Sequence, residues 1–130
     1  MIKKDLFAGW IGIFLLLSNI GIINVVAHDN GDNMSNYIQP NDESVKKIIQ
    51  EKITTPMLLI KRAEILYNYV ADNIDYKSDP EVWGTSDYWQ FPATTIKKGT
   101  GDCEDQAMLL TSLLRSAGFS RDNVRLVYGK

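Results

Sequence analysis

The sequence of 130 residues contains one cysteine, Cys103, and one histidine, His28. A single cysteine cannot form an internal disulfide, so its thiol is free, buried or bonded to a partner chain. The Cys and His spacings of zinc sites are absent, and the consecutive acids beside Cys103 point in different directions on a helix. We therefore predict no metal site and no cofactor, and the length allows one domain at most.

The sequence also lacks an excess of basic charge, because its formal net charge is −2. Its basic pairs are flanked by acids or lie on separate predicted elements. They are Lys46-Lys47, Lys61-Arg62 and Lys97-Lys98. Phosphate backbones are bound by a continuous basic patch, so we expect no nucleic acid as a partner.

One long hydrophobic run is present, at residues 6–27, after the basic pair Lys3 and Lys4. A basic start, an apolar middle and the small residue Ala27 are typical of a secretory signal with its cleavage site. The length also fits an uncleaved anchor, which polar residues within the run disfavour. We predict an exported protein, secreted or anchored on the outer side of the cytoplasmic membrane. It contacts the membrane through residues 6–27 only if the signal is uncleaved.

The remainder of the chain divides into a linker and one domain. Residues 28–41 are rich in Asn, Asp and Gly and are predicted to be the linker, and residues 42–130 the domain. A first helix follows Asn41 or Asp42 as its N-cap, with apolar residues at helical spacing. A second helix is predicted from Pro56, which suits a first helical position. The apolar stripe of this second helix is Leu59, Ala63, Leu66, Val70 and Ile74.

Residues 75–100 have neither helical nor strand periodicity, so we predict an ordered loop. This loop carries the aromatic residues Tyr76, Trp83, Tyr88, Trp89 and Phe91. Large rings in an irregular segment bury their apolar area by packing on the core. The alternative is that Trp89 forms a wall of a substrate cleft.

The best-defined helix runs from Cys103 to about Ala117. Asp102 can cap it, Asp105 can reach back as in a capping box, and Gly118 can end it in the left-handed conformation. An apolar stripe at spacings of three and four predicts a central helix with the thiol at the head of its buried face. Residues 123–128 alternate like one strand, but no earlier segment is interpreted as its partner.

The position of Cys103 suits a nucleophile, because the start of a helix favours the thiolate. Glu104 and Asp105 oppose this effect, although their side chains can turn to solvent. Gly99 and Gly101 allow a substrate backbone to come close to the thiol. Backbone N–H groups here, around Gly101 and Asp102, are candidates for an oxyanion hole.

These residues resemble the transglutaminase-like superfamily, whose fold is papain-like. The resemblance runs from about Ile53 to the end. Its motifs are Trp89-Gln90-Phe91-Pro92, Gly99-Thr100-Gly101-Asp102-Cys103-Glu104-Asp105, Leu113-Leu114-Arg115 and Val124-Arg125-Leu126-Val127-Tyr128-Gly129. The resemblance implies an α+β fold in the form of a truncated core. That core would comprise N-terminal helices, a helix headed by the cysteine and the first strand of the sheet.

The family carries a Cys-His-Asp triad, and Cys103 matches its nucleophile. No residue matches the other two members, and His28 precedes the cysteine instead of following it. The resemblance implies a peptide or protein amide substrate, and a downstream fragment or a longer reading frame would supply the histidine. Whether the chain is an enzyme is therefore left open. The alternatives are a non-catalytic remnant that binds through its aromatic loop at the cell surface, and a dimer linked through Cys103.

Overall fold

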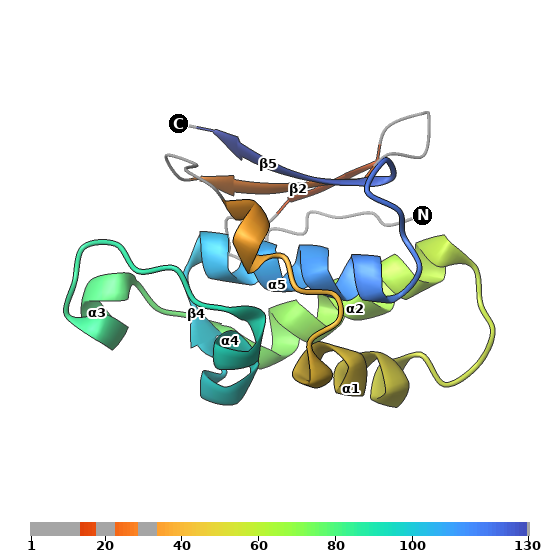
Figure 1. Cartoon of the computed structure of the whole chain (residues 1–130), viewed down its shortest axis with the longest axis horizontal. Helices are drawn as coiled ribbons and strands as arrows, with labels where there is room; N and C mark the ends of the chain where they lie inside the picture. The colour runs from red at the N-terminus through yellow and green to blue at the C-terminus, as the bar shows by residue number, and fades with distance from the viewer. Residues whose placement is uncertain (1–13, 18–22, 29–33, 130) are drawn as a thin grey trace.

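Helix α5 (Cys103–Ser116) runs through the middle of the protein in the computed structural model, which describes residues 14–17, 23–28 and 34–129. A sheet of three strands lies along one side of α5, and the helices of residues 43–52, 59–73 and 92–98 lie along the opposite side (Figure 1). With both sides covered, most of α5 is inaccessible to water. The α+β core built around a central helix, as the resemblance implied, is confirmed.

The ends of α5 follow the predicted signals. Asp102 is the N-cap, and it forms a capping box with Asp105. Beyond the helix, Gly118 has a φ of 109°, a left-handed conformation that glycine adopts without steric cost. The helix is one residue shorter than predicted, because Ala117 is its C-cap.

Helices α1 (Glu43–Lys52) and α2 (Leu59–Asn73) precede α5 in the chain. Helix α1 begins after Asp42, whose side chain accepts hydrogen bonds from two backbone N–H groups, as predicted. The predicted start of α2 at Pro56 is wrong. The helix begins three residues later, after Leu58, whose side chain is 77% exposed. The first buried residue of α2 is Ala63, so packing against the core does not hold residues 56–58 in a helix.

The prediction of an irregular loop over residues 75–100 is wrong. This segment contains β3 (Asp75–Tyr76), α3 (Asp79–Trp83), α4 (Pro92–Lys98) and β4 (Thr100–Gly101). A capping box of Ser78 and Glu81 starts α3, and Pro92 occupies the first turn of α4. Both helices end at a left-handed glycine, and β3 pairs in parallel with β4 just before Cys103.

The sheet has the order β1 (Phe14–Leu17), β2 (Ile23–His28), β5 (Val124–Gly129). The expectation that β5 has no earlier partner is wrong, because β2 pairs with it in parallel and β1 pairs with β2 in antiparallel. Ile23 and Val25 of β2 are buried in the core. His28 ends β2 opposite Gly129. Strand β5 runs back along α5 and ends toward the Cys103 end of the molecule (Figure 1).

The segments that the sequence assigned to export and to a linker are partly described. Residues 1–13 and 18–22 of the predicted signal lie outside the described residues, and export stays a prediction. Across the described ranges, no helix combines the length and the apolar character that a membrane span requires. Within the predicted linker, η1 (Met34–Tyr37) buries Met34 in the core. Gln39 donates a backbone hydrogen bond of 2.9 Å to Ser112 of α5.

Candidate active site at the start of helix α5

Cys103 is the first residue of α5, and its side chain is half-buried. Sequence reasoning had placed it at the head of the buried face, and the structure gives it partial contact with solvent. The Sγ atom lies 3.2 Å from Oε2 of Glu104, in a thiol–carboxyl hydrogen bond. The start of a helix favours a thiolate, whereas a carboxylate at this distance disfavours it.

Asp105 joins the start of α5 to the segment before α4. One of its carboxylate oxygens accepts from the backbone N–H of Gln90, and the other accepts from Gln90 Nε2, both at 2.8 Å. The second oxygen also lies 3.3 Å from the backbone N of Asp102. The Asp102 N–H is therefore engaged within the protein, which argues against the predicted oxyanion role of Asp102.

Gly101 has a packing role in the structure. A Cβ atom at this position would lie 2.7 Å from the Cβ of Asp105 and 3.1 Å from Nε2 of Gln90. Its carbonyl oxygen accepts from the Lys77 backbone and from Gln106 Nε2, each at 3.2 Å. The absence of a side chain makes room for Asp105, and not for a substrate backbone as predicted from the sequence.

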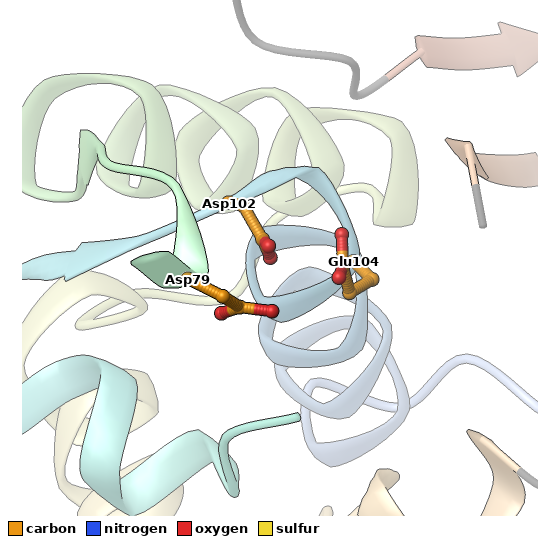
Figure 2. A group of neighbouring side chains, drawn as sticks. All are labelled: Asp79, Asp102 and Glu104. Carbon is orange, nitrogen blue, oxygen red and sulfur yellow. The ribbon is translucent and has the colours of Figure 1, made fainter. Parts of the chain in front are cut away.

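Three buried carboxyl groups surround this helix start. They belong to Asp79, Asp102 and Glu104, which are 4%, 7% and 6% exposed. One oxygen from each lies within 4.8 Å of the others, and Figure 2 shows the groups turned toward one another. We call these three residues the carboxyl cluster. The prediction that Glu104 turns to solvent is wrong, because capping and burial hold this face of the helix inside the fold.

Burial is the main cause of the raised pKa values of the acids at the start of α5. It raises the pKa of Asp102 to about 10, and the nearby charges of Asp105, Glu104 and Asp79 add to the effect. Burial also raises the pKa of Glu104, and a hydrogen bond with Asp102 opposes that rise. Asp102 therefore holds a proton at neutral pH, and its carboxyl group donates it in the hydrogen bond to Glu104.

Two residues of this site were missed by sequence reasoning. Asp79 comes from α3, and its Oδ2 accepts from the Tyr88 backbone at 2.6 Å. Tyr76 of β3 pairs with Gly101, and burial raises the pKa of its phenol, helped by the charges of Cys103 and the carboxyl cluster. Only the capping box of α3 signalled Asp79, and it indicated a helix without placing that helix beside α5. The spacing of the cluster oxygens could accommodate a divalent cation with a preference for carboxylates.

Trp89 is placed with other aromatic residues. Its ring meets the ring of Tyr37 edge to face, with centroids 5.5 Å apart. It lines a pocket whose walls include neither Cys103 nor the carboxyl cluster. Its sequence neighbour Gln90 binds Asp105 at the start of α5.

The family model for the transglutaminase-like superfamily matches residues 42–129. The chain belongs to the transglutaminase-like superfamily. The match spans α1 through β5 and includes the helix start that carries Cys103, so it supports cysteine-based chemistry at this position. No curated protein matches the chain.

Proposed function

We propose that this transglutaminase-like protein is exported and uses Cys103 to cleave or transfer amide bonds. The observation that carries the proposal is the half-exposed thiol at the first position of a buried, capped helix, within the part of the chain that matches the superfamily. Export is proposed from the basic start and the apolar run at residues 6–27, of which residues 23–27 also belong to strand β2, where Ile23 and Val25 are buried. Peptide and protein amides are the proposed substrates.

The proposed reaction begins when the Cys103 thiolate attacks an amide carbonyl carbon, forming a C–S bond. The C–N bond then breaks, and the amine leaves with a proton from a general acid. The resulting thioester is attacked by water in hydrolysis or by a second amine in transfer, which restores the thiol. The oxyanion that forms needs stabilisation, and the start of α5 favours negative charge.

A general base and acid is needed at the thiol, and residues 104–130 contain no histidine. We propose that a longer form of the chain or a downstream fragment supplies this histidine at the end of β5. Two features of β5 support a histidine placed at its end. In the described sheet, β5 pairs only with β2 and therefore lies at an edge, and an edge strand can accept an added strand. It also ends toward the Cys103 end of the molecule (Figure 1). The alternative source is His28, whose backbone ends β2 beside Gly129.

The reactivity of Cys103 tests the proposal, because it is the only thiol in the sequence. Iodoacetamide should alkylate Cys103 faster than it alkylates N-acetylcysteine amide at pH 7. Substituting Glu104→Gln should increase the rate further, by up to about tenfold, since it removes the charge beside the thiol. With an activated acetyl ester, intact-mass measurement should show one acetyl group on the protein and none on Cys103→Ser.

His28→Ala separates the two possible sources of the base. If the variant loses its rate advantage over the model thiol, His28 acts on Cys103 and no further histidine is needed. If the rate is unchanged, His28 is excluded as the base. An unmodified protein that reacts no faster than the model thiol overturns the enzyme proposal and favours the alternative, a non-catalytic module at the cell surface.

A further inference from the structure

A pocket of about 280 Å³ opens between η1 and the segment that joins α3 to α4. Its walls contain four aromatic rings and one acid. They are Tyr37, Asp87, Tyr88, Trp89 and Phe91. No residue of the carboxyl cluster is among them. A ligand in this pocket would therefore occupy a site separate from the carboxyl cluster.

The rings of this pocket have two nearly perpendicular orientations. Tyr37 stacks on Phe91 with centroids 4.6 Å apart and an interplanar angle of 19°. It meets Trp89 at 83°. Tyr88 and Phe91 are 44% and 46% exposed, so a ligand can reach their rings. Aromatic faces carry partial negative charge, and several rings around one cavity are suited to a cation.

The charges around the pocket also favour a cation. Asp87 is the only charged residue among the lining residues, and it is exposed. The neighbouring ring of Trp83, which contacts Tyr88 at 4.2 Å between centroids, already has the Lys98 ammonium 4.5 Å from its centroid. This contact is a cation–π interaction on a ring next to the pocket. No basic side chain lines the pocket to repel a second one.

We propose that this pocket binds an alkylammonium group, carried by a small quaternary amine or by a lysine side chain of another polypeptide. Both sources present the same chemistry, namely a cation with an apolar surface that fits against rings and a nearby carboxylate. The proposal is independent of the proposed function, because it requires no reactivity of Cys103. A site of this kind would retain an amine-bearing partner on the face formed by η1 and the α3–α4 segment.

The test titrates the full chain and follows tryptophan fluorescence. Choline and N-acetyl-lysine amide represent the two sources, and dimethylbutanol, in which carbon replaces the choline nitrogen, is the neutral control. We expect saturable choline binding in the range of about 1 mM, and at least about fivefold weaker binding of the neutral control. Tighter binding of the lysine amide than of choline would assign the site to a lysine side chain.

Two variants show whether the signal comes from this pocket. Asp87→Asn should weaken cation binding about fivefold, whereas Asp122→Asn, a matched loss of charge in the exposed turn before β5, should leave it unchanged. Phe91→Leu should weaken binding by removing one exposed ring. The proposal is overturned if the neutral control binds as tightly as choline, or if no titration saturates. It is also overturned if Asp87→Asn and Asp122→Asn bind choline with the same affinity. The iodoacetamide rate of Cys103 is measured separately, so either proposal can fail without the other.

Discussion

Replacing Asp102 by asparagine removes an acid of the carboxyl cluster whose pKa is strongly raised, while preserving its structural contacts. Asparagine is as good an N-cap as aspartate, so the capping bond to the Asp105 backbone can persist. Its amide can also donate to Glu104, as the protonated Asp102 does. What the substitution removes is the proton that the folded protein holds at neutral pH.

The sign of the effect follows from the two pKa values of Asp102, about 10 in the folded protein and 3.8 as the reference. Between them the folded state holds a proton that the unfolded state has released, so stability falls as the pH rises. The stabilisation is fully present below about pH 4 and is lost toward pH 10. One such proton gives a slope of up to about 1.4 kcal/mol per pH unit.

Urea denaturation at several pH values between 5 and 8 measures this slope. Asp102→Asn should reduce the fall in unfolding free energy by up to about 1.4 kcal/mol per pH unit. A smaller fall should remain, because burial also raises the pKa of Glu104 and Asp105. Asp42→Asn, the same substitution at the N-cap of α1, is the matched control and should keep the wild-type slope. Two results would refute the claim that Asp102 is protonated in the folded protein at neutral pH. One is wild-type stability that rises from pH 5 to 8, and the other is an equal change of stability with pH in both variants.

Two further predictions concern packing around α5. Leu110→Ala should lower the unfolding free energy by about 2–5 kcal/mol, because Leu110 is fully buried, whereas Leu58→Ala at an exposed position should change it by less than about 0.5 kcal/mol. Urea midpoints compare the two, and equal losses would contradict the central position of α5. Gly101→Ala should lower the unfolding free energy by about 1–3 kcal/mol, because the new Cβ would lie 2.7 Å from the Cβ of Asp105. A thermal midpoint that equals the wild type's would show that this close contact relaxes without cost.

Helix α5 could be predicted from sequence because its signals are local. The Asp102–Asp105 capping box, the apolar stripe and Gly118 all lie within one segment. Helices α3 and α4 have five and seven residues, too few to show a period. Their capping box and Pro92 were readable all the same. Short helices are thus better predicted from their ends than from periodicity.

The carboxyl cluster and the sheet depend on contacts between distant segments. Asp79 reaches Asp102 only because α3 folds back on the start of α5, and no sequence spacing encodes that approach. Likewise, β2 lies within an apolar run, and such a run does not distinguish a secretory signal from a buried strand. Its pairing with β5 depends on the tertiary structure.

The two acids that follow Cys103 have different physical roles. Asp105 is held by Gln90 through two hydrogen bonds of 2.8 Å and closes the capping box, so its carboxylate is structural. Glu104 contacts the thiol and shares a hydrogen bond with the protonated Asp102. A proton on Asp102 therefore stabilises the charge of Glu104, and that charge opposes the Cys103 thiolate. The carboxyl cluster thus links the protonation of the helix start to the reactivity of the nucleophile, and Glu104 is the residue through which the two are coupled.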